Sequence, residues 1–193
     1  MRMTKRLTLL AAAIAMIGVA CSSEASPDEI VLLTHSSFAL SEGTLEAFTE
    51  DTGVTVVVQD GGDAGTMLNQ AILTKDNPIA DVIFGVDNTF LSRAIDEGIF
   101  AAHEAEGIDA VSDLIHVDGH MATAIDYGDV CVNYDIEGLA ALDVPPPTSL
   151  EDLTKPTYRD MLVVEDPATS SPGLAFLLAT ISAYPDGSAY DWT

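Results

Sequence analysis

The sequence predicts an α/β protein with a mostly parallel sheet, because short apolar runs alternate with segments of helical periodicity. The runs are rich in β-branched residues, as strands covered on both faces should be. We expect strands at residues 29–35, 54–60 and 80–88, and helices at 43–53, 64–76 and 89–100.

Each of these elements has its own local signature. The run EIVLLTH begins at Glu29 and ends in polar residues, VTVVVQD is nearly all apolar, and ADVIFGVDN repeats that pattern. In the first helix Leu45 and Phe48 have helical spacing, and Gly53 is a stop signal. The next two helices each place apolar residues on one face: Met67, Leu68, Ala71 and Ile72 in one, and Phe90, Leu91, Ala94 and Ile95 in the other.

The pattern becomes less regular after residue 101. Residues 122–135 are typical of extended chain with a break at Asp126-Tyr127-Gly128. Residues 138–156 combine a short helix, a proline-rich stop and a Ser-capped helix. The run MLVVEDP (161–167) is expected to be a further strand, and an apolar helix follows it.

The N-terminus has the features of a signal peptide over residues 1–20: a charged start, a short apolar segment and small residues before Cys21. A cysteine directly after Gly-Val-Ala resembles a bacterial lipoprotein signal. We therefore expect lipidation at Cys21 and a flexible lipid-anchor tether over residues 21–29. Ordinary secretion with an incidental Cys21 is the alternative. The other cysteine, Cys131, lies in an apolar run and is expected to be a buried, unpaired thiol.

The chain is strongly acidic, with a formal net charge of −24 at pH 7. Such a charge argues against nucleic acid and anionic lipid surfaces as partners, because both would repel the protein. The acidic residues are spread along the chain, which favours a solvated surface adapted to salt. A preference for cationic ligands is the alternative interpretation.

Polar residues follow all three of the first strands. In parallel α/β sheets, ligands bind beyond the carboxyl ends of the strands. Each group alone is equally typical of a turn or a helix cap. Their expected position on one edge of the sheet makes them candidate ligand-binding residues: His35, Ser36 and Ser37, then Asp60 and Gly61, then Asp87 and Asn88.

The segment EDPATSSPGLAFLLATI (165–181) predicts a capped helix. Ser171 is the expected N-cap, with Pro172 at the first helical position. Gly173 allows close approach of another group to the backbone, and Ser170 and Ser171 add hydroxyls. A helix N-terminus of this kind binds anions or polar groups well, but an ordinary cap fits the residues equally well.

The common sequence motifs of hydrolases, dinucleotide-binding enzymes and P-loop enzymes do not occur in the chain. His116 and His120 are spaced like a helical metal pair, but the Val-Asp-Gly between them favours a turn. We therefore expect a protein that is not an enzyme, with no catalytic residues, no metal site and no cofactor.

Several segments resemble the thiamine-binding subfamily of ABC-transporter substrate-binding proteins. They are EDPATSSPGLAFLLATI, ADVIFGVDNTFL, AIDYGDVCVNYD, LLTHSSFA and VVVQDGGDAGTMLNQ. The resemblance implies a type II periplasmic-binding-protein-like fold, in which two α/β lobes with mostly parallel sheets close on a solute. Residues 30–123 would form lobe 1, and residues 124–193 the hinge crossing and the first part of lobe 2.

The resemblance also implies roles for the candidate residues. His35 and Asp60 would face the cleft from lobe 1, and Ser170, Ser171 and Gly173 would hold the phosphate or hydroxyethyl end of the ligand. Asp60, Asp87 and Asp126 suit a cationic thiazolium and an aminopyrimidine, and Tyr127 would stack or donate a hydrogen bond. Ser36 stands where related proteins commonly have Asp, which removes one charge contact.

The function that the resemblance implies is capture of thiamine or its phosphates outside the cytoplasm, in the periplasm or on the outer face of the cell membrane. The protein would deliver this ligand to an ABC permease, and we expect a monomer. A protein of the same fold for ferric iron, a polyamine or a phosphonate is the first alternative, and a secreted α/β hydrolase is the second. Family members extend beyond Thr193, so we expect an incomplete, poorly covered lobe 2 and weak or no binding by the 193-residue chain.

Overall fold

The computed structural model describes residues 28–108 and 117–184. The expected signal peptide, Cys21, most of the tether and His116 lie outside these ranges.

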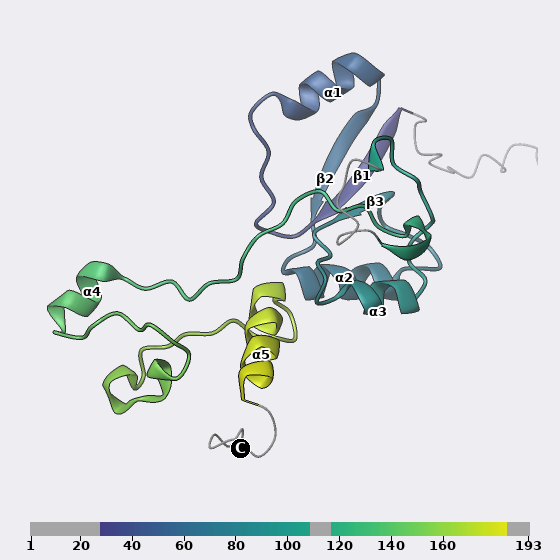
Figure 1. The fold of residues 1–193 in the computed structure, drawn as a ribbon. Coiled ribbons are helices and arrows are strands. Elements are labelled where there is room, and N and C mark those ends of the chain that lie inside the picture. The colour runs from purple at the N-terminus through teal and green to yellow at the C-terminus, as the bar shows by residue number, and fades with distance from the viewer. Residues whose placement is uncertain (1–27, 109–116, 185–193) are drawn as a thin grey trace, which may run out of the picture.

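A parallel sheet of three strands organises the first part of the chain (Figure 1). The strands are β1 (Glu29–Thr34), β2 (Thr55–Asp60) and β3 (Val82–Phe84), in the order β2-β1-β3. Leu32 of β1 pairs with Val58 on one side and Val82 on the other. The predicted α/β class with a parallel sheet is confirmed.

Three helices accompany the sheet: α1 (Thr44–Thr52), α2 (Ala64–Leu73) and α3 (Leu91–Asp96). α2 and α3 lie together and apart from α1 (Figure 1). The predicted stop at Gly53 is confirmed, since this glycine ends α1 with φ of 78°. α3 is shorter than the expected helix 89–100, and α2 ends before the expected residue 76.

The core lies where α2 and α3 meet. Leu68 of α2, Phe90 and Ala94 form a buried cluster, and Met67 is fully buried nearby in the sequence. Leu174, more than a hundred positions along the chain from Leu68, packs against the same cluster. The predicted apolar faces of the two helices are therefore confirmed at these positions.

Cover of the sheet is thinner than the sequence predicts. Val57 and Val58 of β2 are each 40% exposed, although we expected a strand covered on both faces. α1 lies against β2 but buries none of its residues, and its Phe48 is exposed. β3 is also shorter than expected, because Gly85 follows it with φ of 107°, outside the β region.

Residues 128–170, here called the arm, have little regular structure (Figure 1). The arm carries α4 (Ile136–Ala141), and α5 (Ser171–Ala183) returns beside the sheet body. Short 3-10 turns occur at Asp118–His120, Asp152–Thr154 and Pro156–Tyr158. The two turns after Ser149 replace the expected Ser-capped α-helix.

Two further predictions for the arm are wrong. Residues 161–167 do not form a strand, because a strand needs a hydrogen-bonded partner and none pairs with them within residues 117–184. Cys131 is exposed rather than buried, since the surrounding residues 122–135 also form no ladder. The expected poor cover of this part is confirmed by Val163, which is 91% exposed.

Leu68 and Leu73 of α2 should differ strongly in how much an alanine substitution lowers the free energy of unfolding. Leu68→Ala should lower the free energy of unfolding by about 2–5 kcal/mol, because it removes buried methyl groups and leaves a cavity. Leu73→Ala is the matched control and should change this energy by less than about 0.5 kcal/mol, since Leu73 is 85% exposed. Urea denaturation measures both, and equal losses for the two variants would contradict this core.

Candidate functional site

Backbone hydrogen bonds join the carboxyl ends of β1 and β2. The N–H of Gly61 donates to the carbonyl of Thr34 at 2.8 Å, and the N–H of Ser36 donates to the carbonyl of Gly62 at 2.9 Å. The loop with His35, Ser36 and Ser37 therefore lies beside the turn that carries Asp60 and Gly61.

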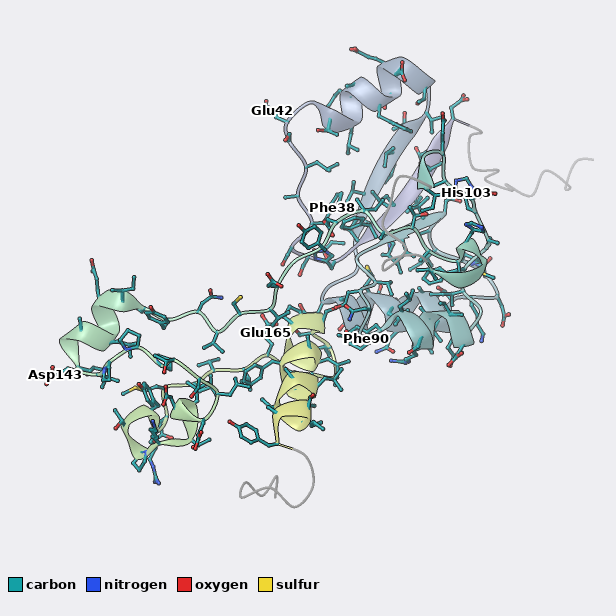
Figure 2. The ribbon with its side chains drawn as sticks, in the orientation of Figure 1. Phe38, Glu42, Phe90, His103, Asp143 and Glu165 are labelled. Atoms are coloured by element: carbon teal, nitrogen blue, oxygen red, sulfur yellow. The ribbon has the colours of Figure 1, made fainter. Side chains whose placement is uncertain are left out.

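Aromatic contacts join the end of β3 to the same edge. The rings of His35 and Phe84 stack with centroids 6.1 Å apart, and the ring centroids of Phe38 and Phe84 are 5.1 Å apart. Gly85 permits this arrangement, because a Cβ at that position would lie 2.3 Å from Cδ2 of His35. Figure 2 shows Phe38 at this edge.

Asp60 and Asp87, which follow β2 and β3, differ in the hydrogen bonds that their carboxylates accept. Asp87 Oδ1 accepts hydrogen bonds from the N–H and the hydroxyl of Thr89, at 3.1 Å and 2.6 Å, so it organises the turn before α3. Asp60 Oδ1 accepts one hydrogen bond from Gly62 N–H at 2.8 Å, and the residue is exposed. Asn88 is also exposed. Asp60 is thus the more available of the two carboxylates.

The start of α5 differs from the prediction by one residue. Ser170, not Ser171, is the N-cap, and its Oγ accepts a hydrogen bond from Gly173 N–H at 3.1 Å. Ser170 has extended backbone angles, whereas Ser171 already belongs to the helix. The Ser170 hydroxyl also donates to the carboxylate of Glu165, which Figure 2 shows beside α5. Local structure therefore accounts for the Ser170 hydroxyl.

Ser171 is different, because the fold leaves its hydroxyl unused. The residue is 9% exposed, and its Oγ is the buried side-chain oxygen without a hydrogen-bond partner in the part of the chain that the structure describes. A buried polar atom without a partner costs about 1–3 kcal/mol. Such atoms in native proteins are explained by a ligand, a water molecule or a functional role.

The turn before α5 lies on the N-terminus of α2. Gly65 N–H donates to the carbonyl of Thr169 at 2.8 Å. α2 directly follows the turn that carries Asp60 and Gly61. This hydrogen bond therefore brings Ser170 and Ser171 beside the polar sheet edge, which consists of residues 35–37, 60–61 and 87–88 at the carboxyl ends of the strands. The structure thus unites residues that are separated by more than a hundred positions in the sequence.

Asp126 and Tyr127 are not packed into this arrangement. Both are exposed, and Tyr127 is 94% exposed. They lie on the extended segment that leads from the sheet body to the arm.

The sequence did not reveal an apolar groove on the arm. Its volume is about 830 Å³, and it is lined mainly by residues 129–135 and 161–165 and by the start of α5. A second groove of about 380 Å³ adjoins it along Phe176, Leu177 and Tyr184. Of the predicted site residues only Gly173 lines either groove. The alternation of Val130 and Val132 is the signal in the sequence that would have predicted an apolar surface here.

An ion pair on the arm has a structural role. Lys155 donates to the carboxylate of Asp152, and the N–H and hydroxyl of Thr148 donate to the same carboxylate, each at 2.8 Å. The Lys155 hydrogen bond, followed by those from Thr148, holds the pKa of Asp152 well below its usual range. These contacts fix the turn after the three prolines and are separate from the sheet edge.

The described residues contain neither a group of metal ligands nor a membrane-spanning helix. Among residues 28–108 and 117–184, no three His, Cys, Asp or Glu side chains are grouped so that they could hold a metal ion. Within the same ranges, every helix is too short or too polar to cross a membrane.

Comparison with known proteins identifies the family. The model of the family described as bacterial extracellular solute-binding protein matches residues 77–192. The chain belongs to this family. The match includes β3, the arm and α5, and so covers both the third strand end and the start of α5.

Curated proteins with similar sequences carry the name thiamine-binding periplasmic protein. The protein of Brucella abortus is 31% identical over 186 residues, which are 92% of this chain and 53% of that protein. The protein of Escherichia coli K12 is 30% identical over 171 residues, 84% of this chain and 50% of that protein. The chain therefore spans about half the length of the curated relatives it matches.

Two solved structures of periplasmic binding proteins have a fold similar to that of this chain. A periplasmic thiamin binding protein is 28% identical, with a TM-score of 0.60 over 83% of this chain and 50% of that chain. The periplasmic binding protein AfuA from Actinobacillus pleuropneumoniae, with bound fructose-6-phosphate, has a TM-score of 0.63 at 22% identity, over 75% of this chain and 47% of that chain. The predicted periplasmic-binding-protein-like fold is confirmed, but the sheet expected in the second lobe is wrong for the described residues 117–184, which contain no strand.

The two serines at the start of α5 should respond in opposite ways to the same substitution. Ser170→Ala removes the cap of Gly173 and should lower the free energy of unfolding by about 1 kcal/mol. Ser171→Ala removes a buried hydroxyl without a partner and should leave this energy unchanged or raise it. Chemical denaturation of both variants tests the assignment, and a larger loss for Ser171→Ala than for Ser170→Ala would contradict it.

Proposed function

We propose that the protein binds thiamine or a thiamine phosphate outside the cytoplasm and delivers it to an ABC permease. Family membership supports the solute-binding role, and the names of the Brucella and Escherichia coli relatives support the ligand. The same proposal includes export by residues 1–20, lipid anchoring at Cys21 and action as a monomer.

The observation that carries the proposal is the buried, unpartnered hydroxyl of Ser171 at the start of α5. In the first turn of α5 the Gly173 N–H is already bonded to Ser170 Oγ and Pro172 has no N–H, so the Ser171 hydroxyl and the positive end of the helix dipole are what suit a phosphate or hydroxyl there. Thiamine ends in a hydroxyethyl group, and its phosphates end in an anion. Ser171 would thus receive that end of the ligand.

The acidic strand ends suit the opposite end of such a ligand. Asp60 is exposed at the carboxyl end of β2, and Asp87 lies in the turn before α3. A carboxylate stabilises a nearby cation, so Asp60 would face the thiazolium ring and the aminopyrimidine. His35 and Tyr127 would contribute ring contacts, and Ser36, Ser37, Asn88 and Asp126 polar contacts.

The proposed mechanism is binding and release without covalent chemistry. Residues 30–123 form one wall and the segment from residue 124 onward forms the other, and closure of the two around the ligand creates the form that the permease recognises. No cofactor takes part, and the protein is not an enzyme.

Calorimetric titration of the full gene product tests the ligand. Thiamine and thiamine monophosphate should bind with micromolar or tighter affinity. Spermidine, a cation that the acidic surface also attracts, should bind at least about tenfold more weakly. Absence of thiamine binding together with tight spermidine binding would replace the proposal by that of a polyamine-binding protein.

The role of Asp60 has its own test. Asp60→Asn preserves the oxygen that accepts from Gly62 N–H but removes the charge. Thiamine affinity should fall about tenfold or more, since hydrogen bonds to charged groups contribute about 1.5–3 kcal/mol. Asp51→Asn, at an exposed position of α1, is the matched control and should bind like the unmodified protein. Unchanged affinity in Asp60→Asn would remove Asp60 from the site.

A further inference from the structure

The contact between the turn 166–170 and the start of α2 depends on a missing side chain. A Cβ at Gly65 would lie 2.9 Å from the carbonyl oxygen of Ala168 and 3.0 Å from both Cα and O of Thr169. Distances below 3.0 Å essentially never occur for real Cβ atoms, and the atoms met are backbone atoms that cannot rotate away. Glycine at position 65 is therefore required for close approach of the two backbones.

The turn that meets Gly65 is held in shape by its own hydrogen bonds. Asp166 Oδ1 accepts from the N–H of Ala168 at 2.9 Å. The carbonyl of Asp166 accepts from Thr169 and Ser170 N–H groups, at 3.1 Å and 2.9 Å. The turn thus presents the Thr169 carbonyl as a preformed acceptor.

The Gly65 N–H is a suitable donor for this acceptor. Gly65 is the second residue of α2, and the first N–H groups of a helix have no acceptor within the helix. The bond to Thr169 satisfies this N–H at 2.8 Å. Leu174 packs against the cluster of Leu68, Phe90 and Ala94 and reinforces the contact.

We propose that Gly65 is a positioning residue, a seat that holds the start of α5 against the polar sheet edge in part of the ligand-free molecules, a population that ligand binding then increases. Residues 122–135, which connect the two parts of the chain, have no regular secondary structure, so the seat rather than the connection fixes the relative position of the two walls. The seat itself does not depend on the proposed function. Its effect on thiamine does rest on that function.

The seat has a thermodynamic consequence for ligand binding. When only a fraction of molecules has the binding-competent arrangement, the apparent affinity is reduced by that fraction. A seat that keeps Ser171 beside the sheet edge raises this fraction. Weakening the seat should therefore weaken ligand binding although Gly65 does not itself contact the ligand.

Amide hydrogen exchange without ligand tests the seat in the full chain. Because the Gly65 N–H has no acceptor inside α2, its protection reports on Thr169 alone. We expect exchange at least tenfold slower than for an unprotected amide. Exchange of Gly65 at the unprotected rate would overturn the proposal.

A pair of glycine variants separates positioning from stability. Gly65→Ala should abolish protection at position 65, increase the radius of gyration in solution scattering and weaken thiamine binding by the full gene product about fivefold or more. Gly53→Ala is the control, because Gly53 has φ of 78° and an added Cβ would meet no atom within 4 Å, so alanine there strains only the backbone at the end of α1, far from the seat. This control should lower the urea midpoint without changing exchange at position 65, the radius of gyration or thiamine affinity.

The outcomes distinguish the two proposals. If neither glycine variant alters exchange at position 65, or both alter it equally, the seat is wrong whether or not thiamine binds. If Gly65→Ala opens the contact but the unmodified protein has no affinity for thiamine, the seat stands and the proposed ligand is wrong.

Discussion

The candidate site depends above all on the parallel pairing of β1 with both of its neighbours. Since β1 lies in the centre of the sheet and all three strands run in one direction, their carboxyl ends meet at a single edge. The bonds between Gly61 and Thr34 and between Ser36 and Gly62 then hold the two loops together. A reversal of either outer strand would move its polar residues to the opposite edge and leave no common binding surface.

Local signals explain which parts of the structure were predictable. The strands, the stop at Gly53 and the buried faces of α2 and α3 follow from periodicity and from the properties of single residues. The cap of α5 was misplaced because two adjacent serines have the same intrinsic preference, and the backbone angles and Glu165 decide between them. Residues 161–167 have strand composition but no hydrogen-bonded partner in the described structure, and such pairing is not a local property.

The structure also separates polar residues that stabilise the fold from those that remain available. Asp87 and Ser170 were candidates for ligand binding, yet each has a local role at the start of a helix. Asp60 is exposed and Ser171 is buried without a partner, so these two carry the proposal. The seat at Gly65 was not predictable from the sequence, since it joins backbones that are more than a hundred residues apart.

A crystal structure of the full gene product with thiamine monophosphate tests the central claim most directly. The account predicts the phosphate within hydrogen-bonding distance of Ser171 Oγ at the start of α5, and the thiazolium ring beside the Asp60 carboxylate. A ligand seated instead in the apolar groove of the arm, with Ser171 still unpaired, would contradict it.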